Sequence, residues 1–464
     1  MTKNNNLDQI KMSSNTDANL ELQKHQGEIE SKVDETAKGN SRRNFFKKSM
    51  LFSTAAVASI GGVATKAKAE YVENPDNLPP NNPEWGLKWG RDTNHSPYGY
   101  PSRYEKHVVR REVPWLTADK KASVSFTPWQ DLKGIIVPNG LFFTRCHGGV
   151  IDINPKEYRL LIHGLVDKEV VLTLDDIKRY PSVTRIHSFE CAANTGMDYR
   201  GPNLNSLQAT YGMVACAEVT GVPLKTILED IGLKPEAKWM FPEGSDPAGV
   251  GRSIPIGKVL DDALLVYAQN GEALRPEQGY PVRLFLPGWE GVMQIKWLRR
   301  LKFDTKSWMV REESTKYTML MPGGHAMMYN WAFNAKSVIT SPCPERNWEG
   351  VKKGPIMIEG IAWSGKGTIT NVDISIDGGK TWEEAEFTSI QLPKAVTRFQ
   401  FKTNWNGDPM LIQSRATDDT GYTQPTTTQL RAARGKEAIY HRNAIQTWEV
   451  KASGEVNNAH IYEV

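Results

Sequence analysis

The chain has 464 residues, of which 39% are hydrophobic and 24% are charged, proportions that are ordinary for a soluble globular protein of two or three domains. Its formal charge of +4 is small and no basic stripe is interleaved with aromatic residues, which disfavours nucleic-acid binding. The nine histidines form no His-x-x-x-His pair, and no Cys-x-x-Cys-His motif is present. We therefore expect neither a zinc ribbon nor a haem in this chain.

The N-terminal region has the composition of a targeting segment. Residues 1–40 are polar and poor in aromatic residues, which predicts disorder. Residues 41–69 begin with "SRRNFFKKSM", continue with a short apolar run and end in "KAKA", a pattern typical of a twin-arginine export signal. An amphipathic surface helix is the alternative. The apolar run is shorter than the roughly 20 residues of a membrane span, and we expect no span elsewhere. The mature protein would then be periplasmic and begin near Glu70.

The first part of the mature chain mixes strand and helix patterns. A strand is predicted over 158–166, a helix entry over 172–181 and a helix over 222–233 that stops at a glycine. The run 280–303 predicts two strands split by a Pro-Gly-Trp turn.

The pattern then becomes all-β. Apolar and polar residues alternate on both sides of Asp377-Gly378-Gly379, a hairpin signature, and two more strands flank Asn406-Gly407. Short strands at regular spacing favour a sandwich of immunoglobulin type. We therefore predict an α+β domain over 70–332, followed by an all-β immunoglobulin-like sandwich over 333–464.

Cys191 is the first candidate for chemistry. It lies in "HSFECAANTG", where Glu190 precedes it and a loop of small residues follows it. A lone cysteine on an apolar strand is usually a core residue, but a thiolate that must point at a ligand needs such a loop. Thiolate suits a soft metal, and no second cysteine or histidine lies at ligand spacing. Further metal ligands would have to come from a cofactor.

Four more residues could bind an anion. Arg145 and His147 alternate in "GLFFTRCHGGV" and could hold a phosphate or oxyanion, or be an ordinary surface arginine and a satisfied histidine. Cys146, between them, is most simply a core thiol. Arg283 and Lys296 lie in apolar strands, where a buried cation needs either a carboxylate partner or a bound anion such as pyrophosphate.

Tyr317 ends the polar turn "REESTKYT". Most tyrosines in such turns are surface residues, although a phenol in an oxyanion pocket can donate a hydrogen bond and relay a proton.

In this order, these segments resemble the sulfite oxidase family of molybdenum enzymes. The most specific part of the resemblance is the run "RSIPIGKVLDDALLVYAQNGEALRPEQGYPVRLFLPGWEGVMQIKWLRRL" over 252–301. Within the family, "LQATYGMVACAEVTGVPL", "REESTKYT", "SRATDDTGYTQP" and "NAIQTWEV" are most similar to the molybdoprotein subunits of sulfane dehydrogenases.

The resemblance implies one molybdenum–molybdopterin cofactor per chain, with Cys191 as the protein ligand of the metal. The implied catalytic residues are Arg145, Tyr317 and Arg415, the last in "SRATDD" from the second domain. The implied cofactor-binding residues are Phe143, Thr144, Arg145, Cys146, His147, Gln278, Arg283, Gln294, Ile295 and Lys296.

The sequence also departs from the family pattern. Gly196 stands where sulfite oxidases carry a sulfite-clamping arginine, a small residue near Ala209 replaces a pocket tryptophan, and Gln278 replaces a histidine. Losing the arginine weakens capture of a small free dianion, and losing the tryptophan opens the site. Both changes favour a long, tethered substrate. Val219 stands in place of an expected tryptophan, which nothing in the sequence explains.

The resemblance therefore implies oxidation of the sulfane sulfur of a thiosulfate or persulfide that is bound to a sulfur-carrier protein. Electrons would pass to a separate c-type cytochrome subunit, docked on a homodimer core as a heterotetramer. The alternatives are a sulfite dehydrogenase on the same fold, a reductase of oxidised methionine, and a non-catalytic secreted protein with a disulfide at Cys191.

Overall fold

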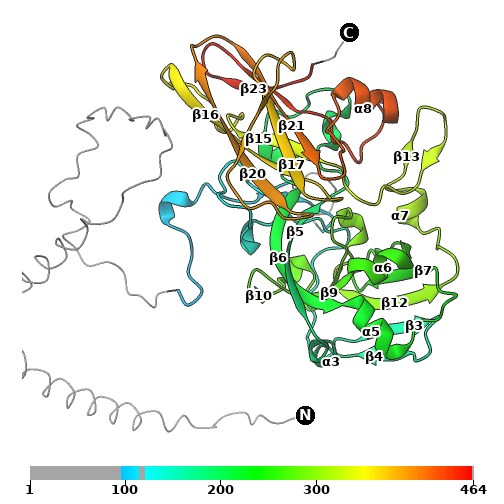
Figure 1. The fold of residues 1–464 in the computed structure, drawn as a ribbon. Coiled ribbons are helices and arrows are strands. Elements are labelled where there is room, and N and C mark those ends of the chain that lie inside the picture. The colour runs from blue at the N-terminus through cyan, green and yellow to red at the C-terminus, as the bar shows by residue number, and fades with distance from the viewer. Residues whose placement is uncertain (1–95, 114–120, 462–464) are drawn as a thin grey trace, which may run out of the picture. The chain divides into compact units, whose positions relative to one another are not determined.

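The structure, a computed structural model, describes residues 96–113 and 121–461, and Figure 1 shows how their elements are arranged. The predicted disordered segment 1–40 and export signal 41–69 lie outside the described residues. Among the residues described, no helix combines the length and the apolar character that crossing a membrane requires.

Two sheets form the first domain. One has the order β10-β9-β6-β5, with β11 also paired to β9, and the other has the order β4-β3-β12-β7-β8. The strands of the first sheet are β5 (Val183–Glu190), β6 (Val214–Pro223), β9 (Leu264–Gln269), β10 (Glu272–Ala273) and β11 (Arg283–Phe285). Those of the second are β3 (Leu160–Gly164), β4 (Val170–Leu172), β7 (Trp239–Gly244), β8 (Ile254–Pro255) and β12 (Leu298–Asp304).

Short helices and strand pairs complete this domain and its connections. The α-helices are α3 (Leu174–Arg179), α4 (Leu207–Tyr211), α5 (Leu224–Ile231), α6 (Ile256–Asp262), α7 (Arg311–Ser314) and, later in the chain, α8 (Thr427–Arg434). The 3-10 helices are η3 (Arg103–Glu105), η4 (Asn139–Leu141), η5 (Gly196–Tyr199), η6 (Pro276–Gln278) and η7 (Gly291–Met293). The paired short strands are β1 (Arg111–Glu112) with β2 (Ser125–Phe126), and β13 (Met319–Leu320) with β14 (Ala326–Met327).

The predicted helices form for local reasons. At the start of α3, Thr173 and Asp176 make a reciprocal capping box, which satisfies two free backbone amides. In α5 every fourth or third residue is apolar and buried, and the helix ends at Gly232, whose φ of 77° suits glycine. The predictions over 172–181 and 222–233 are confirmed.

The two strands predicted over 280–303 are confirmed, but they do not pair with each other. β11 pairs with β9 in the first sheet, whereas β12 pairs with β3 and β7 in the second. The connection between them therefore crosses from one sheet to the other. It carries residues 294–296 across, close to the end of β5.

The C-terminal domain is a sandwich of two sheets, as predicted. One sheet has the order β15-β16-β20-β19 and the other β18-β17-β21-β22-β23, and their apolar residues share one buried cluster. The strands of the first are β15 (Lys336–Ser341), β16 (Gly354–Trp363), β19 (Glu386–Phe387) and β20 (Val396–Trp405). Those of the second are β17 (Ile369–Ser375), β18 (Glu383–Glu384), β21 (Met410–Asp418), β22 (Thr447–Val450) and β23 (Val456–Ala459).

The two glycine turns of this domain differ in what they connect. The turn after Asp377 joins β17 to β18, which pair antiparallel, so the predicted hairpin is confirmed. The turn at Asn406-Gly407 joins β20 to β21, which lie in opposite sheets. That turn therefore links the two layers of the sandwich.

A buried carboxylate joins the two domains. Glu190 accepts hydrogen bonds from Trp363 Nε1 at 2.8 Å and from Asn194 Nδ2 at 2.9 Å, and it forms an ion pair with Lys336. Burial lowers the pKa of Lys336, and the charge of Glu190 opposes that change. Glu190, the residue that precedes Cys191, thus stabilises the junction between the domains.

We expect Lys336→Met to destabilise the protein by about 3–5 kcal/mol, because removing one partner leaves the charge of Glu190 buried and uncompensated. Urea unfolding measures the change. Lys133→Met is the matched control, since it breaks a surface pair with Glu359 at 3.1 Å that contributes only about 0–1 kcal/mol. Equal losses of unfolding free energy in Lys336→Met and Lys133→Met would contradict this role of the Glu190–Lys336 pair. A double variant Glu190→Gln/Lys336→Met that is no more stable than Lys336→Met would contradict it as well.

Candidate active site

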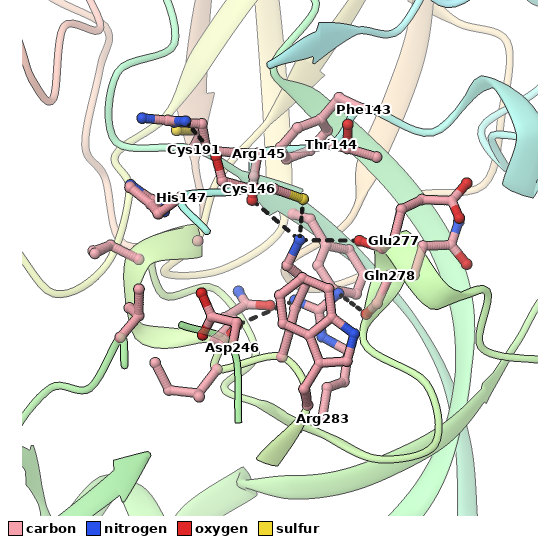
Figure 2. Close-up of a pocket in the computed structure, with 18 of the residues that line it drawn as sticks. Phe143, Thr144, Arg145, Cys146, His147, Cys191, Asp246, Glu277, Gln278 and Arg283 are labelled. Carbon is pink, nitrogen blue, oxygen red and sulfur yellow. Dashed lines mark hydrogen bonds between the residues drawn. The ribbon is translucent and has the colours of Figure 1, made fainter. Parts of the chain in front are cut away.

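A pocket with an open mouth lies at the end of β5. It brings together residues from segments far apart in the chain (Figure 2). The predicted site residues that line it are Phe143, Thr144, Arg145, Cys146, His147, Cys191, Gln278, Arg283, Gln294, Ile295, Lys296 and Tyr317.

Cys191 is positioned directly after β5 by its backbone. Its amide donates to the carbonyl oxygen of Met213 at 3.0 Å, and its carbonyl accepts from the amide of Asn194 at 2.9 Å. Gly291 packs against the same stretch of backbone, and a Cβ there would lie 3.1 Å from the carbonyl oxygen of Glu190. This contact is tight for any residue that has a side chain.

The chemistry of the Cys191 thiol depends on a partner. Burial raises its pKa, while the nearby positive charge of Arg145 opposes this, and Figure 2 shows Arg145 beside Cys191. All four cysteines are free thiols. Within the described residues, no group of three or more His, Cys, Asp and Glu side chains could hold a metal ion. A metal bound by Cys191, which would displace the thiol proton, must therefore bring its other ligands with it.

Arg283 is buried in the wall of the pocket, and no acidic residue of the described segments pairs with it. Its Nη1 and Nη2 donate to the carbonyl oxygens of Gln278 at 3.1 Å and Gln294 at 3.3 Å, and its Nε has no hydrogen-bond partner among the described residues. Burial lowers the pKa of Arg283 to about 10, so the guanidinium stays charged at neutral pH. It is a buried cation with donor capacity to spare.

Lys296 has a similar environment. Its Nζ donates to the carbonyl oxygens of Arg145 at 3.1 Å and Glu277 at 3.0 Å, and to Cys146 Sγ at 3.1 Å, as Figure 2 shows. Across residues 96–113 and 121–461, neither Lys296 nor Arg283 forms an ion pair with a carboxylate. Of the two predicted alternatives, the structure therefore favours a bound anion.

Cys146 differs from the expectation of a simple core thiol. It lines the pocket and accepts from Lys296. In a regular strand the Cys146 side chain would point to the face opposite Arg145 and His147. Residues 143–147 form no regular strand, so this alternation does not apply. The backbone instead turns both Cys146 and its neighbours toward the cavity.

His147 and Tyr317 form a pair on one wall, with His147 Nε2 and Tyr317 Oη 3.0 Å apart. Burial, followed by the charges of Arg145 and Lys296, lowers the pKa of His147 to about 3. Burial raises the pKa of the Tyr317 phenol. At neutral pH the phenol therefore keeps its proton and the imidazole is neutral. The two groups share one hydrogen bond, and the tautomer of His147 sets which of them donates.

Arg415 is the one predicted site residue that the structure places elsewhere. It lies on β21 of the sandwich, where Nη2 pairs with Asp373 Oδ2 at 2.9 Å and the guanidinium lies 4.3 Å from the centre of the Trp382 ring. It lines a different cavity. The structure does not bring Arg415 to Cys191.

Asp246 and Tyr440 are among the residues at or near the pocket that were not predicted from the sequence. Asp246 lines it, and burial raises the pKa of this carboxyl. Gly148 packs so close to the Asp246 loop that a Cβ would lie 2.8 Å from the Ala248 amide nitrogen. Tyr440, from the C-terminal domain, has its ring centroid 5.0 Å from that of Tyr317. The small residues around Asp246 could have indicated a loop that packs closely at the site. The sequence around Tyr440 has no local pattern that indicates its place near the pocket.

The pocket suits an anionic, metal-carrying cofactor. Within the described part of the chain, it combines a thiol without protein co-ligands, two cations without carboxylate partners, and close glycine contacts at Gly148 and Gly291. These are the features that a molybdenum centre held on a pterin phosphate requires.

Comparisons with known proteins agree with this geometry. Residues 147–310 match the family model of the oxidoreductase molybdopterin binding domain, and residues 327–448 match that of the Mo-co oxidoreductase dimerisation domain. The chain is 31% identical over 350 residues to mitochondrial sulfite oxidase of Mus musculus. It is 27% identical over 414 residues to the NADH nitrate reductase of Volvox carteri.

These matches cover 70% and 79% of this chain, but only 63% of the sulfite oxidase and 46% of the nitrate reductase. A solved structure is matched throughout. The chain aligns with the crystal structure of the sulfane dehydrogenase SoxCD from Paracoccus pantotrophus at 48% identity and a TM-score of 0.81. The alignment covers 84% of this chain and 100% of that one. The chain therefore belongs to the sulfite oxidase family of molybdopterin oxidoreductases, as its sequence motifs predict.

Proposed function

We propose that this protein is a periplasmic molybdenum oxidoreductase that oxidises the sulfane sulfur of a thiosulfate or persulfide bound to a carrier protein. Its electrons pass to a c-type cytochrome. The observation that carries this proposal is the environment of Gly196. A Cβ at this position would collide with the carbonyl oxygen of Ile439, so no side chain fits there and no arginine can reach the pocket from it.

This arrangement leaves few cations for a free substrate anion. Arg283 and Lys296 are committed to the cofactor, which leaves Arg145 as the predicted substrate cation that lines the pocket. A small dianion such as sulfite depends entirely on such contacts for its binding energy. A substrate tethered to a carrier protein also gains binding energy from carrier contacts remote from the reacting sulfur, so it needs fewer charges at the pocket.

Each residue then has a physical task. Arg283 and Lys296 would hold the pterin and its phosphate, and Cys191 would bond the metal. When bound, the molybdenum centre supplies two-electron oxidation of sulfur and releases the electrons one at a time. Arg145 orients the anionic end of the substrate, and Tyr317 keeps its proton, because its hydroxyl is buried beside the neutral His147.

We propose partners for this chain from the comparisons with known proteins. A dimer is supported by the match of residues 327–448 to a dimerisation domain. The resemblance to sulfane dehydrogenases implies a cytochrome subunit docked on that core, and the 48% identity to SoxCD supports that resemblance. The predicted export signal at residues 41–69 motivates the periplasmic location.

We expect Cys191→Ser to abolish turnover, with a loss of at least about a thousandfold, because a hydroxyl is a poor replacement for a soft thiolate ligand. The fold should persist, since serine is nearly the same size. Turnover, molybdenum content and thermal unfolding are measured on the same preparation, with Cys343→Ser as the control for a buried cysteine outside the pocket. Retained turnover in Cys191→Ser would remove the ligand assignment.

We expect the protein to oxidise a thiosulfate-charged carrier protein with a kcat/KM at least about tenfold above that for free sulfite. The measurement follows reduction of cytochrome c by molybdenum-loaded protein with each substrate in turn. Faster turnover of free sulfite would instead support the alternative, a sulfite dehydrogenase on the same fold. The uncharged carrier is the control for reduction by contaminating thiols.

A further inference from the structure

Four consecutive residues of the C-terminal domain, Ile439–Arg442, lie along the loop that follows Cys191. We call them the clamp segment. Its first residue packs its carbonyl group against Gly196. The contact explains why this loop is built from small residues, because the backbone of another domain occupies the space that larger side chains would need.

Hydrogen bonds join the rest of the clamp segment to the same loop. They run from Tyr199 Oη to the carbonyl oxygen of Tyr440 at 2.9 Å, from the His441 amide to the carbonyl oxygen of Ala192 at 2.8 Å, and from Thr195 Oγ1 to the carbonyl oxygen of Arg442 at 2.8 Å. In addition, His441 Nδ1 bonds to Glu290, next to the glycine that contacts Cys191. Every residue of the segment therefore contacts the surroundings of the thiol.

The side chain of Tyr440 packs against Tyr317, which lines the pocket. Its ring packs on Tyr317 with a centroid separation of 5.0 Å, and Tyr317 is hydrogen-bonded on its other side to His147. Tyr317 has a φ of 57°, a left-handed conformation that a bulky residue adopts only where its surroundings hold it. Burial raises the pKa of the Tyr440 phenol, and a backbone hydrogen bond of Tyr317 opposes that change, as expected for a phenol packed against Tyr317.

We propose that the clamp segment is a working part of the active site as well as a contact between domains. Tyr440 is a positioning residue that holds Tyr317 against His147, and Ile439 fixes the loop that carries Cys191. The segment also keeps position 196 free of any side chain, which is how the C-terminal domain contributes to substrate choice. This inference rests on the proposed function, in which Cys191 and Tyr317 serve the reacting centre.

The first test uses molybdenum-free protein and needs no turnover. In Gly196→Ala the new methyl group must displace Ile439, so iodoacetamide should modify Cys191 at least tenfold faster than in the wild type, as followed by mass spectrometry. Gly257→Ala is the matched control, because nothing lies within 4 Å of a Cβ built there. An unchanged rate at Cys191 would overturn the role of Ile439. Cys216 and Cys343, both fully buried, report global unfolding if they react.

The second test separates positioning from simple stability. Tyr440→Leu should lower kcat at least tenfold with KM changed less than twofold, whereas Tyr440→Phe, which keeps the ring, should retain at least half of kcat. Tyr180→Leu controls for loss of a half-buried tyrosine elsewhere. Wild-type kcat in Tyr440→Leu, or an equal loss in Tyr440→Phe, would overturn the positioning role. If Tyr440→Leu does not fold, the kcat of Tyr440→Phe and the alkylation rate of Cys191 in Gly196→Ala still test the proposal.

Failure of the proposed role of the clamp segment can be told apart from failure of the proposed function. If free sulfite were the better substrate, the kcat of the wild type and of the Tyr440 variants would be compared with sulfite as the substrate. The alkylation rates are independent of substrate.

Discussion

Two positive charges, Arg283 and Lys296, constrain the rest of this structure. Among the residues that the structure describes, they donate only to backbone carbonyl groups and a thiol, an arrangement that is unfavourable in a closed interior unless an anion completes it. Arg283 lies on β11, and Lys296 lies near the end of the connection that runs from β11 to β12 between the two sheets of the first domain. The fold thus places its cations where a large anionic group can lie, with Cys191 at the far end of the same pocket.

The second domain contributes more than a surface for association. Lys336 and Trp363 reach into the first domain to bind Glu190, one residue before the thiol, and Ile439–Arg442 lie on the loop one residue after it. Both flanks of Cys191 are therefore held by the C-terminal sandwich. Movement of one domain against the other would change the position of the thiol directly.

Much of the site could be predicted from the sequence, because its motifs are contiguous. The FTRCH run, the cysteine after an apolar strand and the cations within 283–296 each carry their own local pattern, and the structure brings them into one pocket. Arg415 was assigned by motif alone and lies elsewhere, paired with Asp373. Nothing local in "SRATDD" reveals that an acidic residue on the neighbouring strand takes up its charge.

What could not be predicted depends on pairs far apart in the chain. The link from Glu190 to Trp363 and the contact of Gly196 with Ile439 join positions more than 170 and 240 apart, and neither leaves a periodic pattern. The strands on either side of Asn406-Gly407 look like a hairpin locally and belong to opposite sheets. Alternation of apolar and polar residues along a segment predicts a strand, but it does not predict which strand pairs with it.

The distance along the chain between Gly196 and Ile439 has a consequence for biosynthesis. A nascent polypeptide that has completed its first sheets already has the thiol and both cations but lacks the backbone that packs on the loop after Cys191. The final position of this loop is therefore set only after the last part of the second domain has been made.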